Sequence, residues 1–249
     1  MSKWVLKGLE TGVKTTVYPE KTETASGVTQ GRPERLELLK DKRSVVNICP
    51  TGAFKINKNI YEIDLTRCIH CLRCLRSPEF PPAGWTGDYE WAFSVSEKTM
   101  KGPFSHCLHI RVVDGGACRA CLCEISQTGA PYYNIHRLGF FITPTPRAAD
   151  VLMVAGPVTD HMRFPLKEAY EAMPEPRAVV AVGTCALSGG IFGRSFASSG
   201  GVSEILPVDI AIPGCPPPPL AIIHGLLILT GRRPSLSVID KPESRRKDK

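Results

Sequence analysis

The sequence lacks any long apolar run. Its best candidate for a membrane span is Leu220–Thr230, which includes His224 and Gly225 and suits a buried helix better. Residues Met1–Glu10 carry lysines but no long apolar core, so no secretory signal is expected. Ten cysteines without such a signal indicate a reducing, cytoplasmic compartment and metal binding rather than disulfides.

Several motifs that mark small-molecule chemistry or nucleic-acid binding are also missing. The sequence contains no G-x-G-x-x-G dinucleotide fingerprint, no phosphate-binding loop and no evident nucleophile–base pair. Nothing in it resembles a nucleic-acid module, so no nucleic-acid partner is expected. The net charge is +7, and residues 232–249 hold seven Lys or Arg against three Asp or Glu. We interpret residues 236–249 as a solvated basic tail, with docking to an acidic partner or lipid headgroups as the alternative.

The C-terminal half alternates between short apolar runs and helix-like stretches. The apolar runs predict strands at Ile110–Val113, Val151–Ala155, Ala178–Val182 and Val208–Ile212. Helices are expected at Phe164–Met173, which Pro174 ends, and at Pro217–Thr230, which Gly231 follows. This alternation predicts an α/β fold with a parallel sheet covered on both faces.

Cysteines follow three of these predicted strands. Cys118 follows the first strand, Cys185 the third and Cys215 the fourth, and Cys121 completes a C-x2-C pair with Cys118. Because parallel strands end at one edge of a sheet, where ligands bind, we expect these cysteines to converge on a shared metal. Four thiolates are what a [4Fe–4S] cluster needs. The remaining Cys107 and Cys123 are expected to be buried core cysteines.

A second group of cysteines lies further toward the N-terminus. Cys68, Cys71 and Cys74 form C-x2-C-x2-C, and Cys49 is followed by proline. Bacterial ferredoxins use three thiolates on one tight loop and a remote Cys-Pro cysteine to hold a cluster. This part of the chain therefore resembles a ferredoxin domain reduced from two clusters to one. A structural zinc site is the alternative, although zinc prefers paired C-x2-C hooks.

Residues around this group carry further predictions. The stretch FKINKNIYEID alternates and predicts a hairpin that turns at residues 57–59. His70 lies inside the cysteine loop, and we expect an exposed loop histidine rather than a ligand. Four aromatic side chains in a Gly- and Pro-rich segment are expected to pack at the seam between two domains: Trp85, Tyr89, Trp91 and Phe93.

Five stretches within residues 107–232 carry a family resemblance: VDGGACRACLCEI, PTPRAADVLMVAGPVT, VVAVGTCALSGGIF, LPVD and PGCPPPP. They resemble the cluster-bearing small subunit of membrane-bound, energy-converting [NiFe]-hydrogenases, including formate hydrogenlyase. The same fold family contains the proximal-cluster subunit of respiratory complex I. The resemblance implies a flavodoxin-like sheet and a proximal [4Fe–4S] cluster on Cys118, Cys121, Cys185 and Cys215.

The chain departs from that family pattern in informative ways. Complex I subunits carry two adjacent cysteines at the first ligand site, whereas this chain has C-x2-C, as hydrogenase small subunits do. Many hydrogenase relatives have an acid directly after the second cysteine; here that residue is Leu122, and the next acid is Glu124. The resemblance implies that Glu124 is a candidate proton carrier. A salt bridge near the helix N-terminus is the alternative.

The stretch KGLETGVKTTVYPE resembles the start of ferredoxin-type subunits that accompany such hydrogenases and complex I. We therefore expect residues 1–98 to form a ferredoxin-like α+β domain with one [4Fe–4S] cluster. Residues 99–235 are expected to form the flavodoxin-like domain with the second cluster. A fusion of this kind is unusual, because the ferredoxin-type subunits are normally separate chains with two clusters.

The resemblance implies an electron-transfer subunit of an oxidoreductase complex. Such a chain relays electrons through two [4Fe–4S] clusters to or from a large catalytic subunit of a [NiFe]-hydrogenase or complex I-like assembly. A ferredoxin-type or dehydrogenase electron partner and indirect contact with membrane-arm subunits are also implied, with a peripheral location on the inner face of the cell membrane. The alternatives are a nickel-free, quinone-linked complex with the same fold and a zinc-stabilised adaptor without a redox role.

Overall fold

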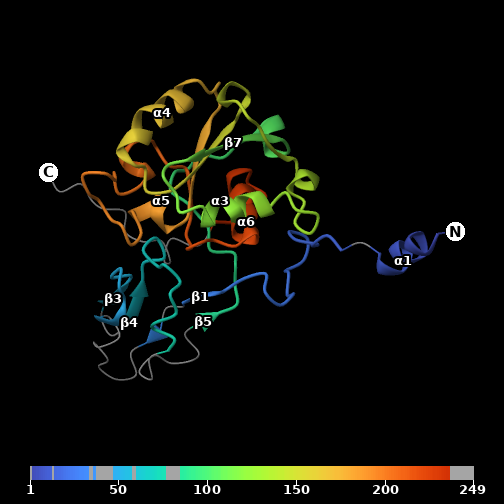
Figure 1. Cartoon of the computed structure of the whole chain (residues 1–249), viewed down its shortest axis with the longest axis horizontal. Helices are drawn as coiled ribbons and strands as arrows, with labels where there is room; N and C mark the ends of the chain where they lie inside the picture. The colour runs from blue at the N-terminus through green and yellow to red at the C-terminus, as the bar shows by residue number, and fades with distance from the viewer. Residues whose placement is uncertain are drawn as a thin grey trace.

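The computed structural model describes residues 2–12, 14–33, 36–37, 47–57, 60–76 and 85–235. Figure 1 shows a large α/β body with a smaller lobe of short strands beside it. Helix α1 (Lys3–Thr11) stands away from both and has no buried residue. The large body is formed by the C-terminal half of the chain, where the strand–helix alternation was found.

The body is built on a six-stranded sheet. Its strands, in spatial order, are β6 (Phe93–Ser94), β11 (Ile210–Ile212), β10 (Ala178–Val182), β9 (Val151–Ala155), β7 (Leu108–Asp114) and β8 (Phe140–Ile142). All neighbouring strands are parallel except β6, which is antiparallel to β11. β9 and β10 are buried at every position, as expected for central strands of a parallel sheet. The predicted parallel α/β sheet is confirmed.

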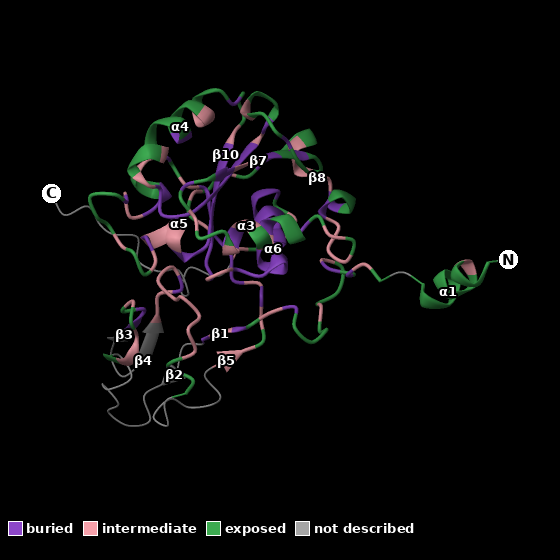
Figure 2. Cartoon of the chain, in the orientation of Figure 1, coloured by how far each residue is buried: buried purple, intermediate pink, exposed green. Residues whose placement is uncertain are grey.

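Helices cover both faces of this sheet. Helices α3 (Ala120–Gln127) and α6 (Pro219–Leu229) share one core cluster, and α4 (Asp160–Glu171) and α5 (Thr184–Ser188) share the other. α6 is buried along its whole length, whereas much of α4 is exposed (Figure 2). Short 3-10 helices complete the described chain at Gly102–Ser105, Ile135–Leu138, Pro146–Ala148 and Val202–Glu204.

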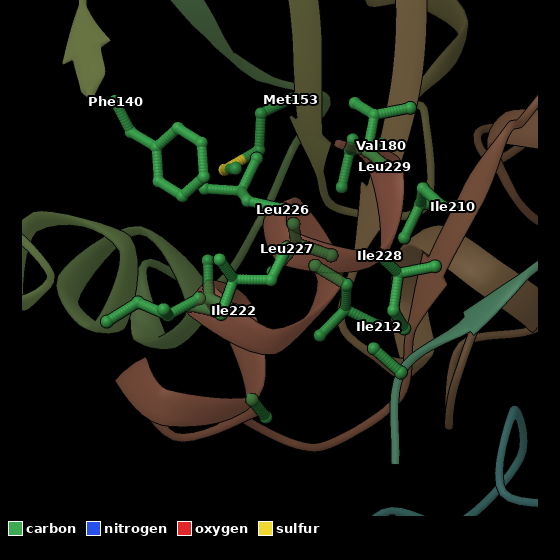
Figure 3. Close-up of a cluster of buried hydrophobic side chains, with 14 of the residues drawn as sticks. Phe140, Met153, Val180, Ile210, Ile212, Ile222, Leu226, Leu227, Ile228 and Leu229 are labelled. Atoms are coloured by element: carbon green, nitrogen blue, oxygen red, sulfur yellow. The ribbon is translucent and has the colours of Figure 1, made fainter. Parts of the chain in front are cut away.

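Helix α6 lies unusually close to the sheet. A Cβ on Gly225 would lie 2.5 Å from Ile212 Cδ1, so only glycine allows this approach without rearrangement. Around it, Leu226 and Ile222 pack in one apolar cluster with Met153 (Figure 3). Because β11 and α6 flank the cysteine at position 215, this dense packing fixes the loop that carries it.

The predicted helices differ from the observed ones mainly at their starts. The helix expected from Phe164 begins at Asp160, where its carboxylate is favourable beside the helix N-terminus, and it continues through Pro165. The last helix runs from Pro219 to Leu229 rather than from residue 217 to 230. These shifts leave the strand ends, and so the site, unchanged.

The smaller lobe contains two short sheets. Strands β3 (Phe54–Asn57) and β4 (Ile60–Ile63) pair antiparallel, which confirms the predicted hairpin, although turn residues 58–59 lie outside the described residues. β2 (Leu36–Glu37) joins β4, and β1 (Arg32–Pro33) pairs with β5 (Trp85–Thr86). The ferredoxin-like character of this lobe stays a prediction.

The two lobes are joined by shared packing. Tyr18, Tyr89 and Trp91 are buried in the same cluster as helix α6. The rings of Tyr18 and Tyr89 meet edge to face at 5.3 Å. β6 extends the large sheet although it precedes residue 98. The domain division at residue 98 stays a prediction, and the basic tail at 236–249 lies outside the described residues.

Candidate functional site

Three loops at one edge of the large sheet carry four cysteines, here called the C-terminal set: Cys118, Cys121, Cys185 and Cys215. β7, β10 and β11 point the same way, so their carboxyl ends lie at the same edge. Cys118 and Cys121 follow β7, Cys185 lies in α5 after β10, and Cys215 follows β11. The structure brings these four thiols together from three separate segments.

Asp114 shapes the loop that leads to Cys118. Its Oδ1 accepts hydrogen bonds from the backbone N–H groups of Gly116 at 2.9 Å and Ala117 at 2.7 Å. Gly116 has a φ of 91°, and a Cβ there would lie 2.4 Å from Thr159 Cγ2. The tight turn therefore needs both the carboxylate and the glycine.

The thiols of the C-terminal set are electrostatic neighbours. Burial, together with the neighbouring Cys185, Cys215 and Cys118, raises the pKa of the Cys121 thiol to about 12. Burial likewise raises the pKa of Cys185 to about 11, with contributions from Cys215 and Cys118. Thiolates gathered in this way need a cation among them, because each one opposes ionisation of the next. The donor set therefore fits an iron–sulfur cluster.

Glycines lie directly against two of these sulfurs. A Cβ on Gly183, whose φ is 87°, would lie 2.5 Å from Cys121 Sγ. A Cβ on Gly190, whose φ is 58°, would lie 2.8 Å from Cys185 Sγ. Because Gly183 and Gly190 have no side chain, the backbone can approach these two sulfurs closely. Backbone N–H groups beside a sulfur tune the reduction potential of a cluster that the sulfur holds.

The other four predicted ligands, here called the N-terminal set, also lie together: Cys49, Cys68, Cys71 and Cys74. Burial raises the pKa of the Cys68 thiol to about 12; the His70 backbone N–H opposes the rise, and the other three thiols add to it. Thr51 Oγ1 donates to the carbonyl of Arg67 at 2.7 Å, which ties the Cys49 segment to the Cys68 loop. The remote cysteine and the triple-cysteine loop are therefore brought to one place.

Local backbone geometry shapes the N-terminal set. Ala53 N–H donates to Cys49 Sγ at 3.3 Å. His70 and Leu72 have φ angles of 48° and 59°, in the left-handed region that few residues other than glycine adopt. These two residues lie between the cysteines of the loop, whose thiols are electrostatic neighbours.

The expectation that His70 is an exposed loop residue is wrong. Its ring stacks on Trp91 with centroids 5.6 Å apart and meets Trp85 edge to face at 6.1 Å. Both ring nitrogens are shielded from solvent without a well-formed hydrogen bond to a described residue. Burial lowers the pKa of His70 to about 4, so the imidazole is neutral. The aromatic segment at residues 85–91 covers the loop, which local sequence could not reveal.

The expectation of buried core positions for Cys107 and Cys123 is also wrong, because both are exposed. Cys107 lies just before β7, and Cys123 lies on α3 two positions beyond Cys121. Two positions along a helix turn a side chain away from its neighbour, so Cys123 leaves the sheet-facing side that Cys121 occupies. Neither residue belongs to a cysteine set.

Glu124 lies on α3, near the C-terminal set. Its charge contributes to the raised pKa of Cys121, and burial raises its own pKa. It lines a hollow of about 230 Å³ together with Gln30, Tyr133 and Pro216. The ion pairs of the described chain do not include it, so the alternative of a salt bridge finds no partner there.

Within the described ranges, no group of three or more His, Cys, Asp or Glu side chains is arranged to hold one metal ion. A zinc ion binds sulfur at about 2.3 Å and so draws its thiolates close together. A four-iron cubane is larger, and its thiolates sit at separate corners. The two kinds of site therefore differ in how close together they bring the sulfurs.

An exposed apolar rim beside the C-terminal set was not foreseen from the sequence. Ile191, Phe192 and Phe196 are 64%, 63% and 99% exposed in the Gly-rich loop that follows α5. Exposed apolar groups of this kind mark interaction surfaces. The sequence feature that could have indicated this surface is the stretch GGIFGRSF, where large apolar residues occur without a helical or strand-like period.

Among the described helices, none combines the length and the apolar character required to cross a membrane. α6 is the most apolar of them, and its eleven residues are buried in the body.

Comparison with known proteins supports the family resemblance. Residues 118–229 match the family described as NADH ubiquinone oxidoreductase, 20 Kd subunit. An uncharacterised protein of Methanocaldococcus jannaschii is 51% identical over 120 residues, which cover 48% of this chain and 80% of that protein. Formate hydrogenlyase subunit 7 of Escherichia coli is 41% identical over 119 residues, or 48% of this chain and 47% of that protein.

An NADH-quinone oxidoreductase subunit of Citrifermentans bemidjiense is 47% identical over 115 residues, which cover 46% of this chain and 66% of that protein. The chain thus spans about half the length of the formate hydrogenlyase subunit and more of the other two relatives. Since it covers 80% of a relative that is 51% identical, and since the matched region holds the whole C-terminal set, the chain belongs to the NADH ubiquinone oxidoreductase 20 Kd subunit family of oxidoreductase subunits.

Proposed function

We propose that the chain is an electron-transfer subunit that holds two [4Fe–4S] clusters and relays electrons to or from the redox site of a partner large subunit. The complex is of the hydrogenase type and membrane-associated, and this chain lies at the membrane periphery through its partners. One observation carries the proposal: thiols from remote segments form two separate groups of four, in which burial and the neighbouring thiols raise the pKa of Cys68 and that of Cys121 to about 12.

The residues of each set have defined roles in this proposal. A bound [4Fe–4S] cluster accepts or releases one electron at a time. The thiolates hold it, while Gly183 and Gly190 admit backbone against the sulfurs of Cys121 and Cys185. Cys74 and Cys121 are buried, and burial and hydrogen bonding to sulfur set the reduction potential. The N-terminal set then exchanges electrons with an outside donor or acceptor, and the C-terminal set faces the partner.

The apolar rim supports this orientation. Ile191, Phe192 and Phe196 lie in the loop directly after α5, which carries Cys185. A large subunit seated on this rim would bury apolar surface and bring its own redox site toward the C-terminal set. Glu124 lies near Cys121 and borders a hollow, so it is the proposed proton carrier in a hydrogenase-type reaction.

A nickel-free, quinone-linked complex is the second candidate. It is favoured by the 47% identity to the NADH-quinone oxidoreductase subunit of Citrifermentans bemidjiense. The C-x2-C pair of Cys118 and Cys121 favours the hydrogenase type, since complex I subunits resemble this region with adjacent cysteines. The partner decides between them: a large subunit with two C-x2-C nickel pairs supports the first, and loss of those cysteines supports the second.

The test is anaerobic purification of the full chain followed by metal analysis. We expect a brown protein with about eight irons per chain, since two [4Fe–4S] clusters hold that many. A colourless protein that contains zinc would contradict the proposal and support the adaptor without a redox role. Co-purification with the large subunit and nickel analysis then separates the hydrogenase type from the quinone-linked type.

A further inference from the structure

Helix α5 carries one cysteine of the C-terminal set and also contacts the loop of the N-terminal set. Thr184 Oγ1 donates to the carbonyl of Cys68 at 2.8 Å. Ser188 Oγ donates to the carbonyl of Thr66 at 2.8 Å. Thr184 and Ser188 are four residues apart in the helix, so they face the same side of it. The Cys68 loop is therefore fastened to α5 at two points.

Thr184 also belongs to the segment that carries the third cysteine loop. Its backbone N–H donates to the carbonyl of Gly214 at 2.9 Å, and its hydroxyl lies 3.2 Å from the same oxygen. Gly214 directly precedes Cys215, and Thr184 directly precedes Cys185. The side chain is fully buried. One threonine thus stands where the segments of Cys68, Cys185 and Cys215 meet.

Aromatic packing joins the same two regions from another side. The His70 ring stacks on Trp91, whose indole Nε1–H donates to the carbonyl of Pro213 at 2.6 Å. Gln30 Nε2 donates to the carbonyl of Pro216 at 2.9 Å. Carbonyls on both sides of Cys215 are therefore bonded to the N-terminal part of the chain. These contacts leave the hydroxyl of Thr184 as the link nearest to the cysteines themselves.

We propose that Thr184 is a positioning residue that holds the two cysteine sets in one fixed geometry and gives the shortest bonded route between them. This inference rests on the proposed function, because it concerns electron transfer between the two sites. The route runs from Cys68 through its carbonyl, the hydroxyl of Thr184 and one peptide link to Cys185. Electronic coupling decays more steeply across an empty gap than through bonds, so a fixed hydrogen bond keeps the transfer step short and uniform.

The experiment compares Thr184→Val with Thr184→Ser in the full chain, purified anaerobically. Valine has the shape of threonine without the hydroxyl, and serine keeps the hydroxyl. In the doubly reduced protein, we expect the through-bond exchange part of the magnetic splitting between the two paramagnetic centres to fall in Thr184→Val and to be retained in Thr184→Ser. The midpoint potential of each centre should stay at its parent value, because the hydroxyl bonds to a carbonyl and not to a sulfur. Splitting that persists unchanged in Thr184→Val would overturn the proposal.

Hydrogen exchange gives a readout that does not depend on metal. Amides of residues 64–76 should exchange about tenfold faster in Thr184→Val, since losing a buried hydrogen bond worth about 1.4 kcal/mol shifts the opening equilibrium by that factor. Thr230→Val is the matched control, because among the described residues its buried hydroxyl bonds to carbonyls within α6. It should leave exchange in this loop unchanged. Equal exchange in Thr184→Val and the parent would also overturn the proposal.

Ser188→Ala keeps the proposal testable if Thr184→Val fails to fold. It removes the second hydroxyl link and leaves Thr184 in place, so we expect faster exchange at residues 64–68 with both centres retained. An unchanged loop in Ser188→Ala, combined with a misfolded Thr184→Val, would refute the positioning role. Iron analysis separates the proposed function from the positioning role of Thr184. A chain without iron refutes the proposed function, whereas hydrogen exchange still measures how firmly α5 holds the Cys68 loop.

Discussion

The N-terminal cysteine set is built mainly from one loop, whereas the C-terminal set is assembled from three loops of a sheet. In the first, Cys68, Cys71 and Cys74 are held by a tightly coiled backbone, and only Cys49 comes from elsewhere. In the second, parallel strands deliver each segment to one edge. The first set therefore draws three thiols from one short motif, while the second depends on strand order and on glycines beside the sulfurs.

The largest expected effect is on the C-terminal set. Replacing Cys185 or Cys215 by serine should remove one cluster and leave the other, because the two sets use different segments. Iron should fall from about eight to about four per chain. The N-terminal signal in the electron paramagnetic resonance spectrum should remain. Loss of both signals together would mean that the sites are not independent.

A smaller effect is expected from the glycines of the same loop. Gly190→Ala places a Cβ 2.8 Å from Cys185 Sγ, whereas Gly193→Ala meets nothing within 4 Å. Their φ angles are close, at 58° and 62°, so both substitutions bring similar backbone strain of about 1–2 kcal/mol. Only Gly190→Ala should also lower iron occupancy of the C-terminal set, measured as iron per chain. Equal occupancy in the two variants would show that the sulfur contact is unimportant.

The N-terminal set should respond more weakly to loss of a single support. Thr51→Val removes the hydrogen bond to the carbonyl of Arg67, which costs about 1 kcal/mol. We expect faster hydrogen exchange in residues 64–76 and an unchanged C-terminal signal. Thr51→Ser should behave like the parent chain. A change confined to the C-terminal signal would show that Thr51 supports the C-terminal set rather than the N-terminal set.

The smallest effect is expected from the cysteines outside both sets. Replacing Cys107 and Cys123 by alanine should leave iron content and both signals unchanged, because neither thiol belongs to a cysteine set. A loss of iron in the double variant would mean that one of them is a ligand. In that case, the assignment of four ligands to each set would need revision.

Much of the sheet follows from the sequence. The strands at Val151–Ala155 and Ala178–Val182 are predicted to the residue, because central strands of a parallel sheet are continuous apolar runs. β7 extends beyond its apolar run to Leu108 and Asp114 because its neighbours continue the pairing. Periodicity marks the core of an element, while partners decide its ends.

The residues that sequence reasoning placed wrongly are those whose surroundings come from remote segments. His70 was expected to be exposed, and Trp91 and Trp85 cover it. Cys123 was expected to be buried, and its position on α3 turns it outward. Neither outcome can be predicted from the neighbouring sequence, since a loop histidine or a helical cysteine can be buried or exposed within the same local sequence.

The amino-acid sequence alone predicts the chemistry: two groups of cysteines with the spacing of iron–sulfur ligands, and an α/β pattern that sends three of their loops to one sheet edge. How the two groups meet is settled only by the folded chain. The hydrogen bond from Thr184 to Cys68 joins residues 116 positions apart. The stacking of His70 on Trp91 adds a second contact between the same loop and the body. Ligand spacing is a property of short segments, whereas a contact between segments exists only once the core has folded.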